Sequence, residues 1–138
     1  MKKIVVSSNT CWNIYNFRFN LIKSLLEKGY KIIILANLDE TCIKLKEMGC
    51  EIYSLNFSRK NKSIFESISL FFSYFFYLKK IKPQVFLSYT IKPNLIGGFV
   101  ANFFKINTIL NFTGLGTLIL DKNFDKKIVF YFLKLTLR

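Results

Sequence analysis

The stretch Ser88-Tyr89-Thr90-Ile91-Lys92-Pro93-Asn94-Leu95-Ile96-Gly97-Gly98 decides the fold class of this chain. It continues an apolar run that is typical of a buried strand, and Pro93 suits the first turn of a following helix. A second turn, Thr113-Gly114-Leu115-Gly116, follows another apolar run. Open α/β sheets bind ligands at polar and glycine-rich turns beyond the carboxyl ends of parallel strands. The two turns therefore predict one shared ligand-binding edge.

The rest of the chain alternates strand and helix patterns. Continuous apolar runs predict strands at 3–8, 31–36, 50–55, 84–88 and 107–112. Helical spacing predicts helices at 15–28, 39–47, 63–82, 93–105 and 126–138, and a polar loop at 8–13. Gly97 and Gly98 weaken a helix, so their presence predicts a close backbone approach. Five such units in sequence predict a doubly wound parallel sheet in a single domain, 1–138.

The helix predicted at 63–82 is unusually apolar. Its only polar stripe is narrow, comprising Glu66, Ser69, Ser73 and Lys80, which predicts cover on nearly all sides. The chain has 16 phenylalanines, more than a core of this size hides. We therefore expect part of the apolar surface to meet a second domain, a partner or a lipid interface. The helix predicted at 126–138 has no end signal, which indicates the front of a longer protein or a truncated reading frame.

The net charge of +13 favours polyanions: nucleic acid, phosphorylated substrates or anionic lipid headgroups. No nucleic-acid-binding module is recognisable, which argues against nucleic acid. Two interpretations of the basic residues at the ends of the apolar helix stay open. They contact a membrane surface, or they lie in solvent at the two ends of a buried helix. The candidates for membrane contact are Arg59, Lys60, Lys62, Lys79 and Lys80.

Other signatures exclude several enzyme classes. The chain has no histidine, which removes the commonest general base and metal ligand, and it has neither a dinucleotide-binding glycine motif nor a P-loop. Three cysteines without metal-like spacing indicate a reducing, cytosolic compartment and no metal site. Cys11 is either a reactive thiol at the edge or a small filler residue.

The candidate binding residues fall into three groups. In the first, Thr10 offers a hydroxyl and Trp12 a flat face for a sugar ring, or Trp12 fills a gap in the adjoining core. Arg18 pairs with a phosphate, with Asp39, or with an acidic residue of a carboxy-terminal domain that this sequence lacks. The second group comprises Tyr89, Thr90 and Lys92. These residues form an anion-binding site at the start of a helix, or they simply cap that helix. The third group comprises Thr113, Gly114 and Gly116. The glycines let a ligand or a second domain approach the backbone closely, or they only form a tight turn.

Together these residues resemble the amino-terminal domain of a GT-B glycosyltransferase of the family 4 type, which builds bacterial surface polysaccharides. The resemblance spans nearly the whole chain, and its specific part is the pair of turns at 89–94 and 113–116. It rests also on weaker features shared by many α/β domains, namely the helix 17–25, the Gly29-Tyr30-Lys31 step, Asp39 and Lys82-Pro83. The implied fold is a Rossmann-like half of the enzyme.

The resemblance implies a hexosyltransferase that moves a sugar from a nucleotide-sugar donor to a polyprenyl-linked or growing polysaccharide acceptor, without a metal or other cofactor. This half would bind the lipid-linked acceptor at the cytoplasmic, inner face of the plasma membrane. The carboxy-terminal half, which would hold the donor, is not in this sequence, so we expect the chain alone to be inactive. We identify no catalytic residue.

Two other functions stay open. One is a non-catalytic, membrane-docking subunit that recruits a separate carboxy-terminal catalytic chain. The other is a small polyanion-binding α/β protein, which salt-sensitive binding to RNA without binding to anionic vesicles would favour.

Overall fold

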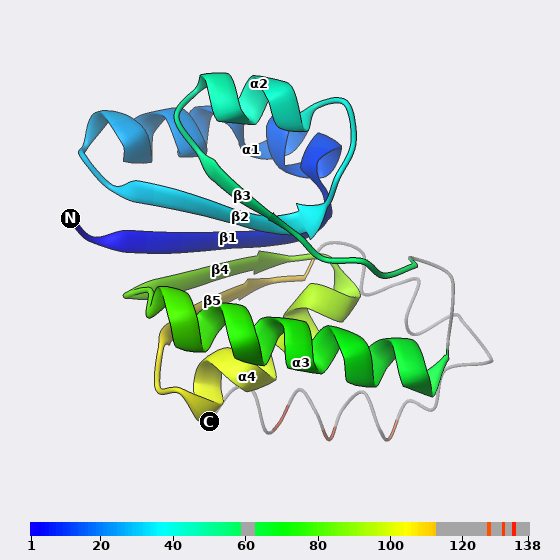
Figure 1. The fold of residues 1–138 in the computed structure, drawn as a ribbon. Coiled ribbons are helices and arrows are strands. Elements are labelled where there is room, and N and C mark those ends of the chain that lie inside the picture. The colour runs from blue at the N-terminus through cyan, green and yellow to red at the C-terminus, as the bar shows by residue number, and fades with distance from the viewer. Residues whose placement is uncertain (59–62, 113–126, 128–130, 132–133, 135–138) are drawn as a thin grey trace.

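A computed structural model describes residues 1–58 and 63–112, together with residues 127, 131 and 134. In this part of the chain a single sheet contains five parallel strands: β1 (Lys3–Thr10), β2 (Lys31–Asn37), β3 (Glu51–Ser54), β4 (Val85–Tyr89) and β5 (Asn107–Asn111). Their order is β3-β2-β1-β4-β5. The chain therefore builds one side of the sheet outward from β1 and then the other, which confirms the predicted doubly wound fold (Figure 1).

Helices cover both faces of the sheet. Helices α1 (Cys11–Glu27) and α2 (Cys42–Glu47) lie on one face, and α3 (Ile64–Ile81) and α4 (Gly98–Phe103) lie on the other (Figure 1). A π-helical turn, η1 (Pro93–Gly97), leads directly into α4. The central strand β1 is buried by both layers, so its apolar residues read as one unbroken run. Val5, for example, pairs with Ile33 and Phe86 and has no exposed surface.

The predicted loop at 8–13 is not a loop. Strand β1 continues to Thr10, and α1 begins at once at Cys11. The reason is a helix cap: the Thr10 side chain accepts a hydrogen bond from the Asn13 backbone N–H at 3.1 Å. Cys11 and Ile14, which follow the cap, are fully buried against the sheet.

Gly97 confirms the predicted close backbone approach. A Cβ atom at this position would lie 2.8 Å from Phe86 Cζ and 2.8 Å from Tyr74 Cε1. Both rings are fully buried, and the Tyr74 hydroxyl is hydrogen-bonded to Ser7 Oγ at 2.7 Å. Only glycine therefore allows η1 to lie this close to α3 and β4.

Helix α3 has one buried face and one exposed face. It buries one face, comprising Leu70, Tyr74, Leu78 and Ile81. Its outer face exposes Ile64, Phe65, Ile68, Phe72 and Phe76, each at least half accessible. We call these five residues the α3 apolar face. No helix in the described part of the chain is long and apolar enough to cross a membrane.

Candidate functional site

The carboxyl ends of β1 and β4 lie side by side at the point where the sheet changes direction. Ser7 pairs with Ser88 in neighbouring strands, and α1 and η1 then leave toward opposite faces (Figure 1). Tyr89, the last residue of β4, pairs with Asn111, the last of β5. Of the two turns predicted to share one edge, the turn that begins at Ser88 lies here beside the end of β1, and the turn at 113–116 lies outside the described residues. Such a switch point is the usual ligand site of doubly wound sheets.

Arg18 lies directly over the end of β4. Its guanidinium carbon is 4.2 Å from the centre of the Tyr89 ring, a cation–π contact. Its Nη1 donates to the Phe17 carbonyl at 2.9 Å, but its Nε is buried without a hydrogen-bond partner. Burial raises the pKa of Tyr89 above its ordinary value, while the Arg18 charge acts in the opposite direction. The phenol is therefore neutral at pH 7, and the edge presents a cation over a neutral ring.

Four buried side-chain atoms in the described residues have no hydrogen-bond partner, and all four lie around the end of β4. They are Arg18 Nε, Ser88 Oγ, Thr90 Oγ1 and Asn94 Oδ1. Two of these residues are linked directly, because the Asn94 N–H donates to Thr90 O at 3.0 Å, and Asn94 Nδ2 donates to Asn111 O at 2.8 Å. A buried polar group without a partner costs about 1–3 kcal/mol, so a ligand or a bound water that pairs with any of these atoms would be stabilised.

Ser88 and Asn94 were not among the predicted site residues. Both are fully buried, and Asn94 belongs to the π-helical turn. Their positions in the strand and in the next turn were visible in the sequence, but their lack of partners depends on tertiary packing. Single π-helical turns are frequent at functional sites, which agrees with this location.

Thr90 adopts a backbone conformation that is unusual for a β-branched residue. Its φ of 68° lies in the left-handed region, where its Cβ is crowded. Strained residues persist where the surrounding structure over-determines them, and they gather at active sites and ligand clamps. Strain and an unsatisfied hydroxyl thus coincide at one predicted residue.

We expect Thr90→Gly to stabilise the folded chain slightly, by up to about 1 kcal/mol, because relief of strain exceeds the entropy that glycine adds to the unfolded chain. Urea unfolding measures this change. Lys105→Gly is the matched control, since Lys105 has a φ of 56° at the end of α4, away from the site. Destabilisation by Thr90→Gly alone would show that Thr90 is not strained.

The other residues predicted near the start of α1 have different surroundings. Thr10 caps the helix, so its hydroxyl has a structural partner. Trp12 is 53% exposed and packs edge-on against Phe17, which contradicts the alternative that it plugs the core. Asp39 accepts from the Trp12 N–H at 2.8 Å and the Thr41 N–H at 2.8 Å, so it does not pair with Arg18. Trp12 thus leaves an open aromatic face beside the edge.

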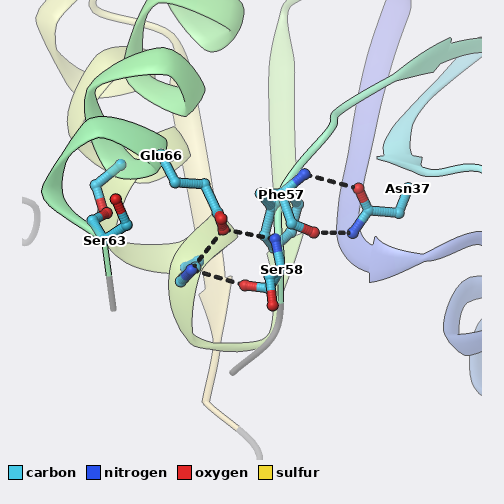
Figure 2. A network of polar contacts seen from close by, with 7 residues as sticks. Asn37, Phe57, Ser58, Ser63 and Glu66 are labelled. Carbon is cyan, nitrogen blue, oxygen red and sulfur yellow. Dashed lines mark hydrogen bonds and ion pairs between the residues drawn. The ribbon is translucent and has the colours of Figure 1, made fainter. Parts of the chain in front are cut away.

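Lys92 takes part in a network that links two segments of the chain. Its ammonium donates to Ser58 O at 2.7 Å and pairs with Glu66 Oε1 at 3.0 Å. Figure 2 shows the Ser58 N–H donating to the same carboxylate, and Asn37 bonded to both backbone groups of Phe57. The network ties the segment after β3 and the start of α3 to the β4 turn. A phosphate contact for Lys92 stays a prediction.

The two described residues that were predicted to contact a membrane, Lys79 and Lys80, lie away from this site. Lys79 and Lys80 are exposed in the last turn of α3. The final residue of this helix, Ile81, lies near the start of β1, because its carbonyl accepts a hydrogen bond from Lys3 Nζ. The two lysines are therefore at the amino-terminal end of β1, opposite to the candidate site. Six predicted residues lie outside the described part of the chain: Arg59, Lys60, Lys62, Thr113, Gly114 and Gly116.

Cys11 is a buried residue, not a reactive thiol at the surface. It has no exposed area, and burial together with the neighbouring Cys42 raises its pKa far above the ordinary value. A nucleophilic thiolate is therefore disfavoured at neutral pH.

The profile of the family described as Glycosyl transferase 4-like matches residues 3–138. The chain belongs to this family. One relative is the N,N'-diacetylbacillosaminyl-diphospho-undecaprenol alpha-1,3-N-acetylgalactosaminyltransferase of Campylobacter jejuni. The two sequences are 28% identical over 118 residues, which is 85% of this chain and 31% of the relative.

Two solved structures place this member of the Glycosyl transferase 4-like family in the GT-B fold. Acinetobacter baumannii MurG has a TM-score of 0.64 at 19% identity, over 88% of this chain and 40% of MurG. UDP-GlcNAc 2-epimerase from Neisseria meningitidis, bound to UDP-GlcNAc, has a TM-score of 0.64 at 20% identity, over 99% of this chain and 39% of the epimerase. At these identities the structures show a shared fold. The chain spans less than half of the length of these three proteins.

Proposed function

We propose that this chain forms the acceptor-binding part of a glycosyltransferase that moves a sugar from a nucleotide-sugar donor to a polyprenyl-linked acceptor. Family membership supports the transferase, and the name of the Campylobacter jejuni relative supports a lipid diphosphate acceptor. The donor-binding groups and the catalytic groups would come from a second domain or a separate chain. No resident metal or other cofactor is proposed for the transfer.

The observation that carries the proposal is Arg18, whose buried Nε has no hydrogen-bond partner and whose guanidinium lies over the Tyr89 ring at the end of β4. Arg18 Nε is a hydrogen-bond donor on a cation, which suits a phosphate oxygen. The Thr90 hydroxyl, at the same end of β4, both donates and accepts, which suits a sugar hydroxyl. A ligand that carries phosphate and sugar side by side would contact Arg18 and Thr90, and the exposed Trp12 side chain lies on the same helix as Arg18.

We also propose that the protein works at the cytoplasmic face of the plasma membrane as a peripheral protein. The support is the α3 apolar face, together with Lys79 and Lys80 in the same helix and a net charge of +13. Apolar side chains that enter the lipid boundary and lysines that face anionic headgroups act together in such helices.

Binding of a short-chain polyprenyl diphosphate that carries N-acetylhexosamine tests the acceptor proposal. We expect calorimetry to detect saturable binding, weakened about 10–100-fold by Arg18→Ala, because a hydrogen bond to a charged group is worth about 1.5–3 kcal/mol. Lys23→Ala is the control, since Lys23 lies on the same helix with its side chain 60% exposed and its ammonium 4.0 Å from Glu27. No binding, or an equal loss in both variants, would refute an acceptor site at this edge.

A further inference from the structure

Two cysteines and a carboxylate that are far apart in the sequence meet at the starts of α1 and α2. Cys11 is the first residue of α1, Cys42 is the first residue of α2, and Asp39 precedes α2. One ligand atom from each, the two Sγ atoms and a carboxylate oxygen, lie within 4.8 Å of one another. The parallel sheet causes this meeting, because β1 and β2 are neighbours and their carboxyl ends release both helices on one face.

We propose that Cys11, Asp39 and Cys42 form a binding site for a thiophilic divalent cation of the zinc class. The donor set fits such an ion, because zinc binds thiolate at about 2.3 Å and carboxylate oxygen at about 2.0–2.2 Å in one compact shell. Two sulfurs on one ion are then at most about 4.6 Å apart, so the observed spacing needs little movement. Hard cations such as Mg²⁺ avoid sulfur ligands and are excluded.

The surroundings hold the three groups in place. The Asp39 N–H donates to Cys42 Sγ at 3.3 Å, while the Asp39 carboxylate is fixed by the backbone N–H groups of Trp12 and Thr41. Such outer hydrogen bonds orient metal ligands. Cys11 has no exposed area and Cys42 has 7%, whereas Asp39 is partly exposed and gives the ion a way in. Three protein ligands leave a fourth position for water or a bound group.

A bound cation would join the starts of two helices that otherwise meet only through hydrogen bonds and packing. Binding replaces the two thiol protons with the metal and releases them, so both sulfurs bind the ion as thiolates. The site lies beside Trp12, whose N–H bonds to the same Asp39, so the ion would also fix the aromatic residue at the edge. This inference does not depend on the proposed transferase function.

Titration of the complete reduced chain with Co²⁺ and then Zn²⁺ tests the site. We expect one equivalent of Co²⁺ to give a thiolate-to-cobalt charge-transfer band, which Zn²⁺ displaces. Cys42→Ser should weaken the band, because one of the two thiolate ligands is lost, and should lower the Zn²⁺ affinity by more than the about 10–100-fold typical of losing an outer-shell partner. Cys50→Ser is the matched control, because Cys50 is similarly buried but is not one of the three clustered ligands.

The wild-type spectrum decides the question even if a variant fails to fold. Absence of the charge-transfer band at saturating Co²⁺ would overturn the proposal. So would a band of unchanged intensity in a folded Cys42→Ser chain, or one that disappears with Cys50→Ser, because the ion would then bind elsewhere.

Discussion

Gly97→Ala is expected to destabilise the chain by about 1–3 kcal/mol, although glycine to alanine within a helix ordinarily stabilises by up to about 1 kcal/mol. The added methyl group would lie 2.8 Å from ring atoms of both Phe86 and Tyr74. Both rings are fully buried, so neither can move aside into solvent. The Tyr74 ring is also fixed by the hydrogen bond between its hydroxyl and Ser7 Oγ. Thermal unfolding should show a melting temperature lower by roughly 5–15 °C.

A double variant separates this steric effect from a general intolerance of η1. Phe86→Leu removes one of the two ring atoms that lie nearest the new methyl group, so the two substitutions should be less destabilising together than the sum of their separate effects. Wild-type stability in Gly97→Ala would mean that η1 does not approach α3 and β4 as closely as described.

The sequence was sufficient to predict the fold, because the signals that determine it are local. Unbroken apolar runs such as Ile4-Val5-Val6 mark strands buried on both faces. Gly97 was predicted to mark a close approach from its cost to a helix, and the Phe86 and Tyr74 rings supply the reason. The start of α1 was misplaced, since polar residues that cap a helix look the same in sequence as residues of a loop.

The candidate site was only partly predictable, because its properties arise from contacts between distant segments. Arg18 and Tyr89 were both predicted, but nothing in the sequence shows that the guanidinium lies over the ring. Lys92 was predicted as a phosphate ligand, and its ion pair with Glu66 depends on how α3 packs. The positive φ of Thr90 has no local signal, because threonine rarely adopts it.

Replacing Phe72 and Phe76 together by aspartate is expected to weaken binding to anionic vesicles by roughly 100-fold or more. Each phenylalanine side chain contributes about 1.5–3 kcal/mol when it leaves water for an apolar environment. The two residues are 62% and 60% exposed on the α3 apolar face, so their replacement removes little packing from the core. Lys79 and Lys80, one turn further along, add an attraction that salt screens.

Sedimentation with phosphatidylglycerol-containing vesicles at low and high salt measures this affinity. The matched control is Leu38→Asp with Ile43→Asp, which adds the same charge at residues 59% and 64% exposed near α2, on the opposite face of the sheet. Because both pairs reduce the net charge equally, a purely electrostatic attraction weakens to the same degree in both. Selective loss in the α3 pair therefore requires apolar insertion, and equal binding by the two pairs would mean that α3 is not the surface that meets the lipid.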